Sequence, residues 1–65
     1  KKKNNVLVVF RQAIQRVGGK KFVTVLGEND SLIRKEVHTG WKEANFVEIV
    51  EGIKETDVIV IEEND

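Results

Sequence analysis

The chain has 65 residues, and its 11 basic and 11 acidic side chains give a formal net charge of zero. At this length it forms at most one domain with a small core, and its balanced charge argues against a strong overall field for nucleic acid or an anionic membrane. The absence of cysteine excludes a disulfide framework and a thiolate metal site, and the single histidine, His38, excludes a multi-histidine metal cage.

The first part of the chain predicts short strands joined by tight turns. Val6–Phe10 reads as an apolar strand, Arg11–Ile14 as a single helical turn, and Gln15–Val17 as the start of a second strand. Gly18 and Gly19 follow. They predict a two-residue hairpin loop, because glycine accepts the positive φ of the turns that hairpins favour.

The middle of the chain predicts two further strands around a turn. In the strand Lys21–Leu26, Val23 and Val25 share one face. Gly27–Asp30 is the clearest turn signal. Leu32–Thr39 alternates with a low density of apolar residues, so we expect it towards an edge of the sheet, where charge discourages aggregation.

The region from Phe46 to Ile61 is expected to organise the fold as strand, turn and strand. Val47 and Ile49 fall on one side of a two-residue period, so the first strand is predicted to be half-buried. Val58–Ile61 is a continuous β-branched run, which predicts a strand that is buried on both faces or lies at a strand exchange.

Two connections in the second half carry specific expectations. Gly40–Asn45 is predicted to be a polar loop holding Trp41, the only indole in the chain. In the later turn, Gly52 can take a positive φ, Ile53 is expected to tuck under the sheet, and Asp57 is expected to accept hydrogen bonds from turn amides.

These elements predict an all-β fold, a small antiparallel β-roll or open barrel of five to six short strands. Residues 1–65 are expected to form a single domain whose ends, 1–5 and 62–65, fray. The chain lacks an initiator methionine and is interpreted as a fragment of a longer protein.

The sequence gives no sign of catalysis, of a metal site or of a cofactor. Ser31 and His38 are seven apart on one extended strand, hence roughly 20 Å apart, too far for a nucleophile and its base. Glu48 and Glu51 are expected on opposite faces of a strand as ordinary solvated charges. Neither pair of residues therefore forms a candidate active site.

Two other functions stay open at this point. Basic residues with Phe22 and Trp41 for stacking are compatible with a small nucleic-acid-binding β-barrel, although the interspersed acids and zero net charge disfavour it. A biotinyl-type or lipoyl-type carrier domain is the second alternative, with Lys20 near a hairpin tip as the lysine to be modified. The residues that normally flank a carrier lysine are absent.

Four segments together, Val6–Ile14, Phe22–Leu26, Glu36–Gly40 and Val47–Val60, resemble the C-terminal portion of HlyD-like membrane fusion proteins, the periplasmic adaptor subunits of efflux systems. The most specific piece is the Val-Glu-Ile-x-x-Gly-Ile-Lys-x-x-Asp-x-Val pattern in the last segment. The chain departs from the family in having Phe10 where proline is usual and Thr56 where glycine is usual.

The resemblance implies a non-enzymatic, membrane-proximal adaptor domain that docks on the extracytoplasmic part of an inner-membrane transporter of the ABC or RND type. It also implies a location in the periplasm or cell envelope, self-association into a ring in the full-length protein, and possible involvement of an outer-membrane channel, with no nucleic acid among the partners. We expect loops at one end of the roll to face the transporter. The expected contact residues are Arg11, Gln12, Arg16, His38, Trp41 and Lys42.

Overall fold

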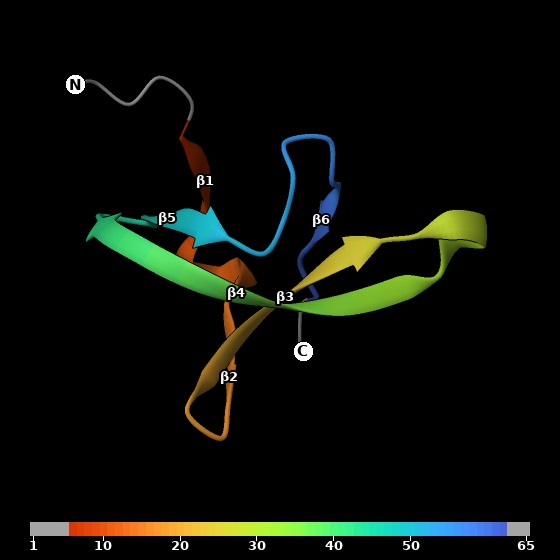
Figure 1. The fold of residues 1–65 in the computed structure, drawn as a ribbon, viewed down its shortest axis with the longest axis horizontal. Helices are drawn as coiled ribbons and strands as arrows, with labels where there is room; N and C mark the ends of the chain where they lie inside the picture. The colour runs from red at the N-terminus through yellow and green to blue at the C-terminus, as the bar shows by residue number, and fades with distance from the viewer. Residues whose placement is uncertain (1–5, 63–65) are drawn as a thin grey trace.

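The computed structural model describes residues 6–62, which form six strands and two short 3-10 turns (Figure 1). Their bounds are β1 Leu7–Phe10, η1 Arg11–Ala13, β2 Gln15–Val17, β3 Lys20–Leu26, η2 Glu28–Asp30, β4 Leu32–Glu43, β5 Phe46–Glu51 and β6 Ile59–Val60. The strands run in the order β1-β5-β4-β3-β2, all pairings are antiparallel, and β6 pairs with β3. The predicted all-β antiparallel roll is confirmed. Of the residues expected to fray, only Glu62 lies within the described part.

Two predictions about the region of β4 are wrong. The strand does not lie at an edge of the sheet, and residues 40–45 do not form a six-residue loop, because β4 continues to Glu43. It spans 12 residues and includes Trp41. Its first half pairs with β3 and its second half with β5, with a shift of register between Thr39 and Lys42. Figure 1 shows it as the long curved ribbon that links the two halves of the molecule. The alternating charged residues show that one face of the strand is exposed to solvent. Whether a strand is central depends instead on backbone hydrogen bonds along both of its edges, and the side-chain pattern carries no information about these bonds.

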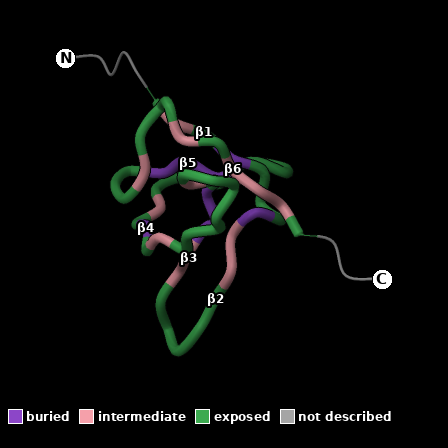
Figure 2. Tube along the Cα trace, turned by 90° about the vertical axis from the view of Figure 1, so that its right-hand side faces the viewer, coloured by how far each residue is buried: buried purple, intermediate pink, exposed green. Residues whose placement is uncertain are grey.

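The hydrophobic core lies on the face of β3 that holds Val23 and Val25 and on the face of β5 that holds Val47 and Ile49. Val23 and Val25 on β3 and Ile49 on β5 are buried, and Ile53 packs against the same cluster, as its position in the turn predicted. Figure 2 shows buried stretches, in purple, along β5. The buried cluster consists of Val9, Ala13, Val23, Val25, Val37 and Ile49. Burial on both faces is wrong for Val58–Ile61, because β6 is only two residues long and Val58 is exposed. A β-branched run supplies strand propensity, but here only a short stretch of β3 is available to pair with it.

The prediction that Glu48 is a solvated charge is also wrong, because its side chain is buried and only 6 % exposed. Its Oε1 accepts a hydrogen bond from the Trp41 N–H at 3.3 Å. A side chain at Gly40 would collide with this carboxylate, so the absence of one leaves the room that Glu48 occupies. The irregular register of β4 at this point presents a backbone donor to the strand face, and that donor compensates part of the cost of burying the charge.

Phe10 occupies the place where the resembling family has proline, and its backbone has a proline-like conformation. Its φ is −67° and its ψ is 142°. The Arg11 N–H donates to the Asn45 carbonyl at 2.7 Å, so the neighbouring pair Phe10 and Phe46 is a non-hydrogen-bonded pair of the ladder. The two rings stack with centroids 5.2 Å apart. The bend after β1 therefore forms without proline.

The turn between β5 and β6 has the predicted chemistry. Gly52 has a φ of 122°, and the Lys54 N–H donates to Asp57 Oδ2 at 2.8 Å. Lys35 Nζ lies 3.6 Å from the same oxygen. Thr56 is not among the residues with positive φ, so the turn needs no glycine there.

The pKa of Asp57 is held below its ordinary value, chiefly by the hydrogen bond from the Lys54 N–H and, against some desolvation, by the charge of Lys35. A lowered folded-state pKa means that the ionised carboxylate stabilises the fold. That stabilisation is fully present above about pH 4 and is lost as the pH falls through the folded-state value. We expect the unfolding free energy to fall less between pH 6 and pH 3 in Asp57→Asn than in the natural chain, as measured by denaturant melts. An equal fall in both would assign the acid sensitivity to other carboxylates.

Candidate functional site: a cationic cavity in the roll

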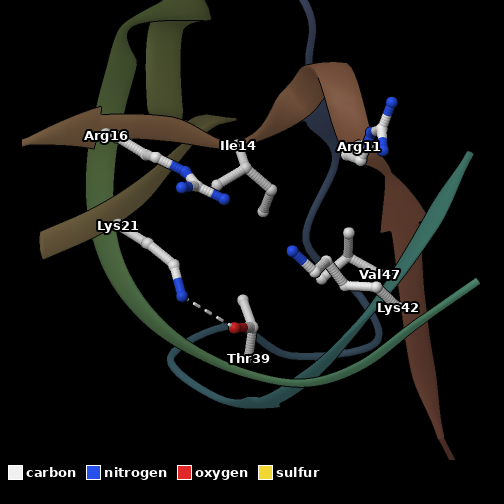
Figure 3. A pocket seen from close by; sticks show the side chains of 7 residues that line it. All are labelled: Arg11, Ile14, Arg16, Lys21, Thr39, Lys42 and Val47. Carbon is white, nitrogen blue, oxygen red and sulfur yellow. Dashed lines mark hydrogen bonds between the residues drawn. The ribbon is translucent and has the colours of Figure 1, made fainter.

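A cavity of about 230 Å³ opens on the inner side of the curved sheet and is lined mainly by basic residues (Figure 3). We call its four cations the cationic mouth: Arg11, Arg16, Lys21 and Lys42. The remaining lining residues are Ile14, Thr39 and Val47. In Figure 3 the nitrogens of Arg16, Lys21 and Lys42 point into the cavity from different sides, while Arg11 stands at its edge.

The sheet register brings these cations together. Lys21 lies on β3 two residues before Val23, so it extends the core-facing row of that strand. Arg16 on β2 is its direct partner across the ladder, which places two positive side chains opposite each other on one face. Lys42 on β4 is the partner of Val47 on β5 and closes the cavity from the other half of the sheet.

Within the described part of the chain, no carboxylate neutralises the charges of the cationic mouth. Within residues 6–62, none of the four forms an ion pair with a carboxylate, and no acidic side chain lines the cavity. Lys21 Nζ donates a hydrogen bond to Thr39 Oγ1 at 3.2 Å, and this neutral acceptor orients the amine without neutralising its charge. Like charges placed opposite one another on a sheet are destabilising, so this arrangement costs stability in the absence of an anion.

Three of the six expected contact residues, Arg11, Arg16 and Lys42, meet at this cavity. Lys21 belongs to the same site but was not among the expected contacts. The sequence does carry a signal for it, because a lysine in the period-two row of Val23 and Val25 occupies the core-facing side of its strand. A charge in such a row marks the position where the apolar core ends.

The structure does not bring the other three expected contacts into the cavity. Gln12 lines a separate cavity beside β6. His38 is exposed on β4, where it pairs with Glu51. Trp41 is 46 % exposed and lies by a shallow apolar depression with Phe46.

The structure also bears on metal binding, membrane spanning and the stacking of nucleic-acid bases. Within residues 6–62 no group of three or more acidic or histidine side chains is placed to hold a metal ion, and no helix there is long and apolar enough to cross a membrane. The Arg34 guanidinium lies 5.8 Å from the centroid of the Phe22 ring, so a cation of the domain itself already covers one of the two aromatic groups offered for base stacking.

Residues 7–64 match the family described as the CzcB C-terminal circularly permuted SH3-like domain. No curated protein and no solved structure matches the chain. The family match covers almost the whole sequence and includes every strand of the described fold.

Proposed function

Because this chain belongs to the family of CzcB C-terminal circularly permuted SH3-like domains, the C-terminal domains of heavy-metal efflux membrane fusion proteins, we propose that it docks such an adaptor onto its inner-membrane transporter. Domains of this family are non-catalytic adaptor domains, and membrane fusion proteins act outside the cytoplasm. The proposed role is therefore mechanical coupling through a protein interface.

The observation that carries the docking role is the cationic mouth. Four cations line one cavity, and no carboxylate of residues 6–62 pairs with them. Arg16 and Lys21 are direct cross-strand partners, and like charges in such a pair do not stabilise a sheet. Such an arrangement is explained when a partner supplies the opposite charge, because electrostatic complementarity sets the orientation and the rate of protein association. The exposed Trp41 adds an aromatic side chain of the type that anchors interfaces.

The finer features of the proposal follow from the family resemblance. The transporter is of the ABC or RND type, the full-length adaptor self-associates as a ring around the transport axis, and an outer-membrane channel takes part through other domains. The remaining expected contacts, Gln12 and His38, are exposed and stay part of the proposal. Cross-linking from each of these two positions in assembled complexes tests the two contacts. A cross-link to the transporter would support the contact, and its absence would remove that residue from the proposed interface.

Replacing both Trp41 and Lys42 by alanine in the full-length adaptor should impair efflux while the fold stays intact. Trp41 is 46 % exposed and outside the buried cluster, and Lys42 lines an open cavity, so neither substitution leaves a void in the core. Host resistance to the exported compound measures the loss, and immunoblotting confirms equal adaptor levels.

The matched control is Lys20→Ala combined with Val50→Ala, which also removes one cation and one exposed apolar side chain but leaves the cavity unchanged. Full resistance is expected for the control. Full resistance in the Trp41 and Lys42 variant would contradict the docking role of these two residues.

A further inference from the structure

The cationic mouth has a composition that specifies the chemistry of its partner. Two of its four cations are arginines, whose planar forks bind carboxylate and phosphate groups in a bidentate manner. Its floor is apolar, because Ile14 is half-buried and Val47 is buried. The site thus combines an anion-binding rim with a place for a short hydrocarbon stem.

We propose that the cationic mouth receives an acidic side chain, glutamate or aspartate, from a protruding segment of the transporter. The cavity of about 230 Å³ is large enough for one or two such side chains. The stem of the acid contacts Ile14 and Val47 while its carboxylate is held between Arg16, Lys21 and Lys42 (Figure 3). This inference rests on the proposed docking function and names the chemistry of the docked segment.

A membrane surface fits the site less well than a protein segment. The cations point into a cavity on the inner side of the sheet, while the exposed apolar side chains of Val8, Trp41 and Phe46 surround a different depression. Val47, in the cavity, and Phe46, in the apolar depression, are neighbours on β5, so their side chains point to opposite faces of the sheet. A flat bilayer therefore cannot contact the cationic mouth and the exposed apolar side chains at once. The zero net charge of the chain also provides no general attraction to anionic lipid.

The first test titrates the ¹⁵N-labelled 65-residue chain with a hexaglutamate peptide and follows amide chemical shifts. The expected result is saturable shifts at Ile14, Thr39 and Val47 that weaken as salt is raised. Inorganic phosphate and phosphatidylglycerol vesicles serve as competing probes. Absence of shifts at these amides, or stronger shifts with phosphate or with the vesicles, would overturn the assignment to an acidic protein segment.

Arg16→Glu separates a binding role from a structural one. The substitution places a carboxylate opposite Lys21, so the melting temperature should rise while affinity for hexaglutamate falls about tenfold. Lys20→Glu is the matched control, because Lys20 is exposed, precedes Lys21 and does not line the cavity. It should keep its affinity within about twofold. Equal losses in both variants, or a fall in stability with a fall in affinity for Arg16→Glu, would overturn the proposal.

The full-length adaptor distinguishes failure of this inference from failure of the docking function. Deletion of residues 7–62 and the double substitution of Arg16 and Lys21 by glutamate are compared for transporter co-purification at equal adaptor levels. Loss of co-purification with both the deletion and the double substitution supports the inference. Loss with the deletion but not with the double substitution overturns the acidic-segment assignment alone, whereas co-purification that survives the deletion overturns the docking function and this inference with it.

Discussion

Gly52→Ala should unfold the domain at room temperature. Gly52 has a φ of 122°, a conformation that residues with a Cβ rarely adopt. A Cβ at this position would also collide with the Glu36 carbonyl oxygen and lie 2.9 Å from the Val37 Cα. Both groups belong to the backbone of the central strand, which cannot move aside without disturbing two ladders. The combined cost is about 3 kcal/mol or more, comparable to the whole stability of a domain of this size.

The control for this prediction is Gly18→Ala in the β2–β3 hairpin. Gly18 also has a positive φ, 57°, but a Cβ there meets nothing within 4 Å. The substitution should lower the unfolding free energy only by the penalty for a Cβ at positive φ, which is about 1 kcal/mol. Circular dichroism during urea titration compares the two. Similar midpoints for both variants would show that the close approach at Gly52 is not what the fold depends on.

Ile49→Ala should cost about 2–5 kcal/mol of unfolding free energy. Ile49 is 4 % exposed and belongs to the buried cluster, where it pairs with Leu7 on β1 and Thr39 on β4. Truncation leaves a cavity between three strands, and so small a core has little capacity to close it. The denaturant midpoint measured by circular dichroism should fall sharply, and the chain is expected to be largely unfolded at the upper end of this range.

The neighbouring residue provides a matched control, because Val50 lies on the same strand and is 62 % exposed. Val50→Ala should change the unfolding free energy by no more than about 0.5 kcal/mol. A loss at Val50 equal to that at Ile49 would mean that the outer face of β5 is packed as tightly as the inner one, which would contradict the described burial.

Local signals in the sequence predicted most of the fold. The turn at Gly18 and Gly19 and the helical turn after β1 depend on neighbours in the chain, and both are confirmed. The alternation also places Val23 and Val25 on one face of their strand, and the structure buries both. The position of β4 was not predictable in this way, because a strand becomes central through pairing with segments on either side of it. The burial of Glu48 likewise depends on Gly40 and the Trp41 N–H, which lie on a different strand.

The candidate site was predicted only in part for the same reason. Arg11, Arg16 and Lys42 were expected at one end of the roll, and the structure places them around one cavity. Trp41 was expected beside Lys42 in a loop, but a strand turns successive side chains to opposite faces, so the two are separated. The cross-strand partnership of Arg16 and Lys21 is a matter of register, and that depends on the length of the hairpin loop.

The shared strand β4 also bears on the order in which the domain assembles. Its pairings with β3 and β5 join neighbours in sequence, whereas β1 reaches β5 from the opposite end of the chain, as in the pairing of Leu7 with Ile49. Closing a long loop costs more entropy than closing a hairpin. We therefore expect β3, β4 and β5 to form the nucleus and β1 to join last. In native-state hydrogen exchange, the amides of β4 should be the slowest and should report opening of the entire domain.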